Sequence, residues 1–284
     1  RVIYIIGGYA MKVAVIPNGR AAGVHAALPA VCAQLQALGA QTLCPASGAF
    51  PSPEADELIG ACDAVVALGG DGTIIHTAKR AAAFDRAVLG INCGTLGFMA
   101  GLEADELEQL AKLIAGEYTI ESRMLLEVRV SGAKERRFYA LNEAVVSRGS
   151  LSRIVELDIC NHDKPVMTYE GDGVIVATPT GSTGYSLSAG GPVVDPEVSC
   201  LLVTPVCPHS LHCRSTIFSA DAVLSVRANV ERCPEIYLTV DGEEGLRVGE
   251  RDVVTISRAD RAARLIKIKQ QSFYDVLTQK LVNR

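Results

Sequence analysis

The chain has 284 residues, of which 49% are hydrophobic and 5% aromatic, and its formal net charge is −5. This length suffices for one large domain or two ordinary domains with a substantial core, and the acidic balance argues against nonspecific binding to nucleic acid. No apolar run reaches the roughly 18 residues of a membrane span, and nine scattered cysteines favour reduced thiols in the cytoplasm over the disulfide framework of a secreted protein.

Residues 1–10 lack the charged start and long apolar stretch of a signal peptide, so we expect an added or upstream extension there, or alternatively an extra edge strand. From Met11 onward, short apolar runs alternate with helical patterns, which predicts a parallel sheet. The predicted strands are Met11–Asn18, Gln41–Cys44, Ala64–Leu68 and Val88–Ile91, and the predicted helices are Ala21–Leu38, Glu54–Ala61, Thr73–Ala83 and Ala104–Ala115.

The stretch Asp63–Thr73, DAVVALGGDGT, joins an apolar run to a glycine-rich turn. The run Ala64–Leu68 is typical of a strand buried on both faces, and the helix that follows places the glycines at the carboxyl end of this strand. Glycine N–H groups and a helix start suit an anionic phosphate. Asp71 would repel that phosphate unless it accepts a proton from a hydroxyl or faces a metal ion, which is the logic of a kinase. The alternative is that Asp71 merely caps the helix.

A second glycine-rich loop, Asn92–Phe98 with the sequence NCGTLGF, follows the next predicted strand. Ligands of open α/β sheets bind at the carboxyl ends of strands. Because the two loops follow consecutive strands, we expect them to line one crevice.

The pattern changes near Tyr118, where turn residues separate apolar strands and few helices intervene, which predicts a second, largely antiparallel β domain. The last stretch, Ser272–Leu281, is predicted to be a helix that is capped by Ser272 and packs on a neighbouring domain. The predicted strands are Thr119–Val130, Phe138–Val146, Ile154–Ile159, Gly173–Ala177, Leu201–Val203, Val223–Val226, Ile236–Val240, Val253–Ile256 and Leu265–Ile268.

Two polar constellations lie in this β-rich part. Asn142 and Glu143 sit inside an apolar stretch, where they need partners if they are buried; the alternative is a solvent-facing strand edge. The segment Gly171–Pro192, GDGVIVATPTGSTGYSLSAGGP, combines small hydroxyl residues and glycines with Tyr185, which can stack on a flat ring. The alternative, a flexible linker, fits poorly because Tyr185 and Leu187 lie between two predicted strands.

Five stretches together resemble the NAD kinase family in order and spacing: GGDGT at 69–73, INCGTLGFMA at 91–100, NE at 142–143, the 171–192 segment, and TPVCPHSLHCR at 204–214. The 171–192 segment is the specific one, since diacylglycerol kinases, sphingosine kinases and phosphofructokinases carry relatives of GGDG. The resemblance implies transfer of the γ-phosphoryl group of ATP to the 2′-hydroxyl of the adenosine ribose of NAD. It also implies a site between two domains, a divalent metal, usually Mg²⁺, and dimers or tetramers.

The resemblance further implies roles for individual residues. Asp71 is similar to the proton acceptor of the family, Asp172 to the carboxylate at the nicotinamide end, and Asp241 to an Asp near the acceptor ribose. His76 stands where Arg is common, and Gly184 where Ala is common. The implied nucleotide-binding residues are Gly69, Gly70, Gly72, Thr73 and His76 for ATP; Asn142, Glu143, Asp172, Thr180, Thr183, Gly184, Tyr185, Ser186, Leu187, Ser188 and Asp241 for the acceptor; and Arg153 for a ligand phosphate. No side chain is predicted to ligate a metal directly.

The predicted fold is α/β + β: a Rossmann-like, parallel-sheet α/β domain over residues 11–117, to which 270–284 return, and a β-rich, β-sandwich-like domain over 118–269. The expected partners are small-molecule nucleotides, with no nucleic acid and no membrane, and we expect a homodimer or homotetramer in the cytoplasm. Two alternatives stay open, a catalytically inactive dinucleotide-binding sensor and a lipid kinase of the diacylglycerol type. An ordinary dehydrogenase is disfavoured, because no G-x-G-x-x-G follows the first strand.

Overall fold

The computed structural model describes residues 10–19, 22–46, 51–94, 97–132, 134–149, 154–210, 212–229, 233, 235–243, 245–270 and 272–282. The extension predicted at residues 1–10 lies outside this range except for Ala10. The chain divides into two compact units, Arg1–Ser122 together with Ala263–Arg284, and Arg123–Ala262.

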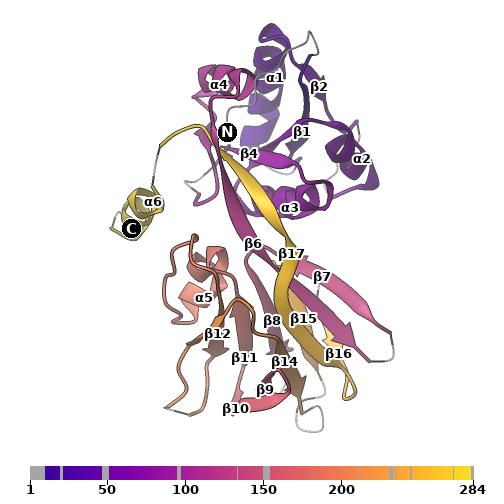
Figure 1. The fold of residues 1–284 in the computed structure, drawn as a ribbon, viewed down its shortest axis with the longest axis vertical. Helices are drawn as coiled ribbons and strands as arrows, with labels where there is room; N and C mark the ends of the chain where they lie inside the picture. Colours follow the sequence, from indigo (N-terminus) through magenta and orange to yellow (C-terminus); the bar gives the residue numbers. More distant parts are fainter. Residues whose placement is uncertain are drawn as a thin grey trace. The chain divides into compact units, whose positions relative to one another are not determined.

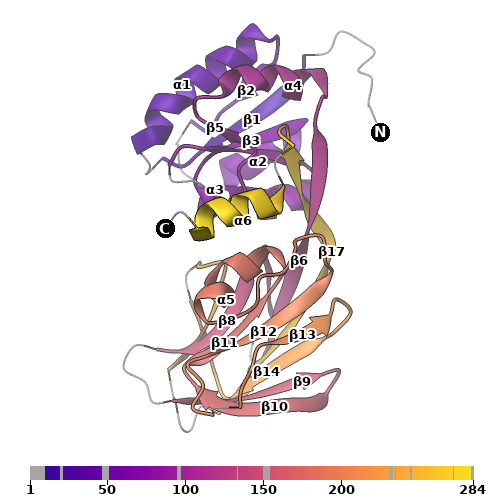
Figure 2. The same ribbon diagram turned by 90° about the vertical axis from the view of Figure 1, so that its left-hand side faces the viewer.

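The first unit is a parallel sheet between two layers of helices. Helices α1 and α4 cover one face of the sheet, and α2 and α3 cover the other (Figures 1 and 2). The strands run in the order β2 (Gln41–Leu43), β1 (Lys12–Pro17), β3 (Ala64–Gly69) and β4 (Ala87–Asn92), and β4 also pairs with β5 (Leu102–Glu103) and with the end of β17 (Val253–Lys267). The helices are α1 (Ala22–Ala37), α2 (Pro53–Ala61), α3 (Asp71–Ala81), α4 (Leu110–Ala115) and α6 (Phe273–Val282), with short 3-10 helices η1 (Ala82–Phe84) and η2 (Leu107–Gln109).

Local signals in the sequence account for the helix boundaries of this unit. Gly39, two residues after the end of α1, adopts φ +86°, a left-handed conformation that favours glycine at a helix end. Ser52 caps α2 by accepting the N–H of Ala55 at 3.2 Å. Ser272 caps α6 as predicted: its hydroxyl accepts the N–H of Asp275 at 3.2 Å, while Asp275 accepts the Ser272 N–H at 3.0 Å.

The second unit consists of two facing layers of antiparallel strands. One layer has the order β13 (Thr216–Ser219), β12 (Cys200–Val206), β11 (Gly173–Ala177), β8 (Glu143–Arg148), β15 (Ile236–Val240) and β16 (Leu246–Val248). The other has the order β10 (Lys164–Gly171), β9 (Val155–Asn161), β14 (Leu224–Ala228) and β17, with β6 (Thr119–Ser131) and β7 (Arg136–Ala140) beside β17. This architecture confirms the predicted α/β + β fold class.

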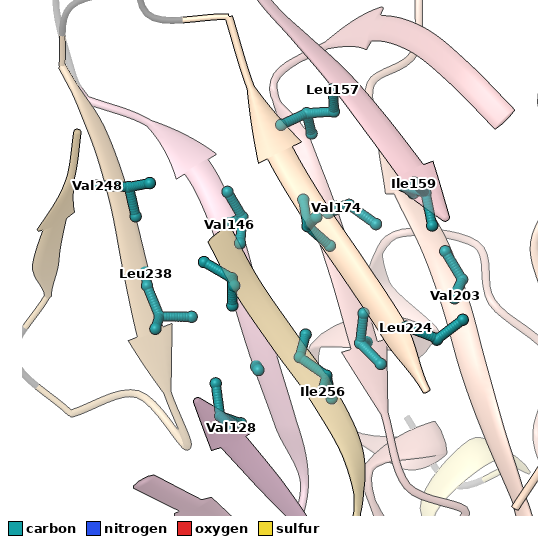
Figure 3. Packing of buried hydrophobic residues seen from close by; sticks show 14 of the residues in the cluster. Val128, Val146, Leu157, Ile159, Val174, Val203, Leu224, Leu238, Val248 and Ile256 are labelled. Carbon is teal, nitrogen blue, oxygen red and sulfur yellow. The ribbon is translucent and has the colours of Figure 1, made fainter. Parts of the chain in front are cut away.

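Apolar side chains from both layers form the core of the second unit. Figure 3 shows Val146, Val174 and Val203 of one layer facing Leu224 and Ile256 of the other, and all five are almost fully buried. This burial of β-branched and aliphatic side chains supplies the main driving force for folding of a unit with no Trp.

Strand β11 is buried on both faces, and this positions the segment that follows it. Val174 and Val176 point into the sandwich core, whereas Ile175 and Ala177 belong to a second apolar cluster that includes Val194. The residues between β11 and Val194, which contain η3 (Thr180–Thr183) and α5 (Tyr185–Ser188), therefore pack on the outer face of this layer.

Three element predictions were wrong. The predicted strand Phe138–Val146 is two strands, β7 and β8, because the chain turns at Leu141 and Asn142. The predicted strands Val253–Ile256 and Leu265–Ile268 form one strand, β17, whose polar middle carries no apolar signal. The predicted helix Ala104–Ala115 begins at η2, because Glu103 and Glu106 form a hydrogen-bonded turn before it.

None of the helices in the described ranges is long and apolar enough to cross a membrane.

Candidate active site

The GGDGT turn lies at the carboxyl end of β3, as predicted. Gly69 is the last residue of the strand, Gly70 is the N-cap of α3, and Asp71 is the first residue of the helix. A Cβ atom on Gly69 would lie 2.4 Å from the Thr73 hydroxyl, so this close approach requires glycine. Among the described atoms, a Cβ atom on Gly70 or Gly72 would meet nothing within 4 Å. The turn therefore presents open glycine backbone at a helix N-terminus, which suits a phosphate.

The two glycine-rich loops meet at Asp71. Strands β3 and β4 are neighbours, with Gly69 paired to Asn92. The Asp71 carboxylate accepts the backbone N–H of Phe98 at 2.9 Å and that of Met99 at 3.1 Å. These donors lie at the end of the second loop and directly after it, not in α3, so Asp71 acts there as more than a cap of its own helix. A Cβ atom on Gly97 would lie 2.1 Å from Asp71 Oδ1, so glycine is required for this approach.

The sequence did not indicate a further charged group beside Asp71. Lys280 of α6 places its Nζ atom 3.7 Å from Asp71 Oδ2 and 4.1 Å from the centre of the Phe98 ring. The Phe98 ring also contacts Phe273 of α6, with ring centroids 6.2 Å apart. Helix α6 thus packs within the first unit against the loop that holds Asp71. A lysine near a helix C-terminus usually complements the helix dipole, which is why the sequence pattern carried no signal for this role.

In the second unit, Asp241 organises the turn that contains Asn142 and Glu143. Its carboxylate accepts three backbone N–H groups, those of Leu141 at 2.8 Å, Asn142 at 2.8 Å and Glu143 at 3.1 Å. This capture of N–H groups ends β7 and starts β8, which explains the incorrect prediction of one continuous strand. Asp241 itself has φ +48°, a left-handed conformation that Asp tolerates better than most residues.

The segment after β11 packs closely on this turn. Thr178 donates its backbone N–H to the Asn142 carbonyl at 2.8 Å and its hydroxyl to the Leu141 carbonyl at 2.6 Å. A Cβ atom on Gly181 would lie 2.2 Å from the Asn142 carbonyl oxygen, and one on Gly184 would lie 3.0 Å from Glu143 Oε2. The structure therefore brings together three sequence-distant groups that were predicted separately: the Asn142–Glu143 pair, the segment around Tyr185, and Asp241.

Glu143 is a buried carboxyl group, and only one of its two oxygens has a hydrogen-bond partner among the described residues. The backbone N–H of Tyr185 hydrogen-bonds its carboxylate, whereas Oε2 has no hydrogen-bond partner within the described residues. Burial, with a smaller contribution from the charge of Asp241, raises the pKa of Glu143 from 4.5 to about 7. A buried acceptor without a partner is costly unless a donor reaches it.

The residues predicted around the adenosine fall into two groups. Tyr185 is 46% exposed, and Ser188 is also exposed, so both can meet a ligand. Ser186 is fully buried and hydrogen-bonded to the Thr204 hydroxyl at 2.9 Å, and Thr180 is buried and accepts from Arg123 at 3.3 Å. The remaining members, Thr183, Gly184 and Leu187, are partly exposed. Direct ligand contact by Ser186 and Thr180 stays a prediction, while their geometry gives them a supporting role.

The remaining predicted residues are Asp172, His76 and Arg153. Asp172 forms an ion pair with Arg148, with Oδ1 and Nε 2.7 Å apart. His76 is partly exposed on the second turn of α3. Arg153 lies outside the described residues.

The described side chains do not form a complete metal-binding site by themselves. Among the described residues, no group of three or more His, Cys, Asp or Glu side chains could hold an ion. Magnesium often keeps several waters and binds through one or two carboxylates plus substrate phosphates. One carboxylate, Asp71, beside the open glycine turn fits an ion that is held mainly by phosphates.

Two family models match the chain: the ATP-NAD kinase N-terminal domain over residues 39–118 and the ATP-NAD kinase C-terminal domain over residues 141–268. The chain is 43% identical over 234 residues to the NAD kinase of Caldanaerobacter subterraneus subsp. tengcongensis, covering 81% of this chain and 82% of that protein. It is 47% identical over 226 residues to the NAD kinase of Symbiobacterium thermophilum, covering 78% and 79%.

Solved structures support the fold. The chain is similar to yeast NADH kinase complexed with NADH, with a TM-score of 0.85 and 24% identity over 96% of this chain and 88% of that one. It is also similar to an NAD kinase from Archaeoglobus fulgidus in complex with ATP, with a TM-score of 0.77 and 24% identity over 96% and 100% of the two chains.

Proposed function

This chain belongs to the ATP-NAD kinase family, and we infer from that membership that it transfers the γ-phosphoryl group of ATP to the 2′-hydroxyl of the adenosine ribose of NAD, giving NADP. The reaction breaks the bond between the γ-phosphorus and its bridging oxygen and forms a bond from the same phosphorus to the ribose oxygen. A ribose hydroxyl is a weak nucleophile, so catalysis depends mainly on positioning and on charge stabilisation.

We propose that Asp71 accepts the proton of the 2′-hydroxyl. The observation that carries this assignment is the fixed orientation of its carboxylate, which two backbone N–H groups of the second loop hold at the start of α3. A carboxylate fixed in this way needs no reorganisation when the hydroxyl arrives. Gly70 and Gly72 flank Asp71, and their open backbone supports binding of the ATP phosphates beside it.

The acceptor nucleotide is assigned to the second unit. We propose that Glu143 Oε2 forms a hydrogen bond with the nucleotide, because this buried oxygen has no partner within the described residues. Tyr185 would offer its exposed ring to the adenine, and Asn142 would offer its side-chain amide. Asp241 is a positioning residue in this proposal, since its carboxylate is engaged by three backbone N–H groups of the same turn.

We propose that a Mg²⁺ ion, when bound, would be held mainly by the ATP phosphates and would neutralise charge on them. Asp71 is the carboxylate that could contact such an ion, because it lies beside the open glycine turn. His76 lies one turn along α3 from the same glycines and would face the donor phosphates.

We further propose that the enzyme works in the cytoplasm as a homodimer or homotetramer, as the family resemblance implies. The scattered free thiols support the first part of this proposal. Light scattering after size-exclusion chromatography measures the mass of the assembly; a mass of about 30 kDa, that of one chain, would contradict the second part.

The activity is tested directly. The protein is incubated with NAD, ATP and Mg²⁺, and NADP is detected with an NADP-specific dehydrogenase. We expect NADP from the wild type, none without ATP, and a strongly reduced amount from Asp71→Asn. A sensor would bind NAD and form no NADP with any phosphoryl donor, and a lipid kinase would phosphorylate diacylglycerol in the parallel assay.

A further inference from the structure

A pair of thiols lies in the first unit, on elements that the proposed kinase site does not use. Cys32 belongs to α1, and Cys44 follows β2 directly. Their Sγ atoms are 3.6 Å apart, with both side chains reachable from solvent: Cys44 is exposed and Cys32 partly exposed. All nine cysteines are free thiols, so this pair is reduced in the structure.

The connection between α1 and β2 holds the two thiols together. The chain reverses at Gly39, where Gly39 N–H donates to Gln36 O at 2.9 Å and Ala40 N–H donates to Leu35 O at 3.0 Å. One helical turn beyond Cys32, the Gln36 amide donates to the Thr42 hydroxyl at 2.9 Å. These contacts fix the helix against the strand, so the thiols are neighbours before any reagent arrives.

We propose that Cys32 and Cys44 are a redox-active dithiol that reduces low-molecular-weight disulfides and closes an intramolecular disulfide between α1 and the end of β2. A disulfide needs sulfurs about 2.05 Å apart. From 3.6 Å this requires a small rotation of the two side chains, and Cys44 is exposed directly after β2.

The two thiols differ in a way that suits stepwise exchange. The hydrogen bond from Cys44 lowers the pKa of Cys32 to about 7, against the opposing effect of burial. The same hydrogen bond, together with burial and the nearby Cys32 charge, raises the pKa of Cys44. Cys32 is therefore the more ionised thiol of the pair at neutral pH, and Cys44 keeps its proton until Cys32 has reacted.

The exchange balances without a further reactant. The Cys32 thiolate attacks one sulfur of the disulfide RSSR, the S–S bond breaks, and one RS⁻ leaves. Cys44 then loses its proton and attacks Cys32 Sγ, which expels the second RS⁻ and forms the Cys32–Cys44 bond. Two protein thiols are oxidised, one disulfide is reduced to two RSH, and the two cysteine protons are those taken up by the leaving thiolates.

The experiment uses the full chain and glutathione disulfide at pH 7. After quenching with iodoacetamide, peptide mass spectrometry locates each modification. In the wild type we expect the peptides of Cys32 and Cys44 to be joined, with the loss of two hydrogens and no retained glutathione. Cys207, an exposed thiol in the same chain, is the internal control and should keep glutathione. Cys32 should react about threefold to fivefold faster than a free cysteine with the ordinary pKa of about 8.5, because a larger thiolate fraction outweighs its lower nucleophilicity.

Two variants separate the roles of the thiols. Cys44→Ser should trap glutathione on Cys32, and Cys32→Ser should leave Cys44 reacting no faster than Cys207. Dithiothreitol should restore both wild-type thiols. A stable glutathione adduct on Cys32 of the wild type, or unmodified Cys32 and Cys44 while Cys207 reacts, would overturn the proposal. Kinase activity reports whether each variant is folded, since neither thiol belongs to the proposed active site.

Discussion

The carboxyl groups of Asp71, Glu143 and Asp241 were all predicted as site residues. They differ in how many hydrogen bonds their oxygens accept from the protein. The Asp241 carboxylate accepts hydrogen bonds from three backbone N–H groups. The Asp71 carboxylate accepts two backbone N–H groups and lies beside Lys280. Glu143 has one buried oxygen without a hydrogen-bond partner among the described residues. The sequence suggested all three as candidate site residues but did not predict this division, because each set of donors comes from chain positions far from the carboxylate. This division supports the roles proposed above: positioning for Asp241, proton acceptance for Asp71 and ligand recognition for Glu143.

Replacing Asp71 with Asn should lower turnover by about 10²–10⁴, the usual effect of removing a positioned base. NAD affinity should change far less, because the amide still hydrogen-bonds a hydroxyl. Steady-state kinetics and calorimetry on the same variant separate the two effects, and Asp105→Asn, an exposed carboxylate on another loop, is the control. Full turnover in Asp71→Asn would leave Asp71 as a structural anchor of the second loop.

Glu143 should make the stability of the protein depend on pH. The folded state holds this proton up to a pKa of about 7, while the unfolded state loses it near 4.5. Between these values the folded state binds more protons, so the free energy of unfolding falls as the pH rises, and the loss is complete above about pH 7. Glu143→Gln cannot titrate. Relative to this variant, the wild type should lose about 2–3 kcal/mol between pH 5 and pH 8, measured by urea unfolding. A difference that is constant with pH would contradict a buried, protonated Glu143.

At the scale of elements, apolar runs were predicted reliably and polar or very short strands were not. Strand β3 is apolar throughout and β11 nearly so, and both were located to within a residue. Strands β10, β13 and β16 were missed: Lys164–Gly171 is mostly exposed, and the other two span four and three residues at sheet edges. Such strands are held by pairing with a neighbour, and a single sequence does not encode that neighbour.

The segment between β11 and Val194 should bind the adenosine through Tyr185. Tyr185→Ala should raise the KM for NAD about tenfold to a hundredfold, because loss of base stacking costs roughly 1–3 kcal/mol. The KM for ATP and kcat should change little, since the contact is the same before and at the transition state. Tyr185→Phe keeps the ring and should keep the affinity. If Tyr185→Ala instead lowers the melting temperature and weakens both substrates, Tyr185 is a packing residue.

Helix α6 should support catalysis through Lys280. Its ammonium group contacts the Phe98 ring and lies 3.7 Å from Asp71, and Phe98 N–H is one of the two donors to that carboxylate. Cation–π contacts and partly exposed ion pairs each contribute about 0.5–1 kcal/mol. Lys280→Ala should therefore lower kcat about fivefold to tenfold with an unchanged dissociation constant for NAD. Lys280→Arg should recover most of this loss, and Gln279→Ala, at an exposed neighbour on α6, should cause none. Equal kcat in all three variants would remove α6 from the catalytic arrangement.

At the scale of the whole molecule, the change of pattern near Tyr118 separated an α/β part from a β-rich part, and the structure has compact units at Arg1–Ser122 with Ala263–Arg284 and at Arg123–Ala262. The sequence could not show that single strands run through both units. Strand β6 begins in the first unit and continues in the second, and β17 pairs with β14 at Val254–Ile256 and with β4 at Arg264 and Leu265. The middle of β17 is polar and lacks the apolar pattern of a strand, so the sequence predicted two separate strands there.

This continuity predicts that the two units unfold together. If the second unit unfolds, the first half of β17 loses its pairing with β14. Fraying of the strand then reaches its pairing with β4 in the first unit. We therefore expect that one unit does not stay folded when the other unfolds. Differential scanning calorimetry should show one transition. NAD at about 100 times its dissociation constant should stabilise the protein by about 2.7 kcal/mol and move that transition as a whole by a few degrees. The shift should persist in Asp71→Asn, which retains binding, and shrink in Tyr185→Ala at the same NAD concentration. Two resolved transitions, of which NAD moves one, would mean that the strands shared by the units do not couple their stabilities.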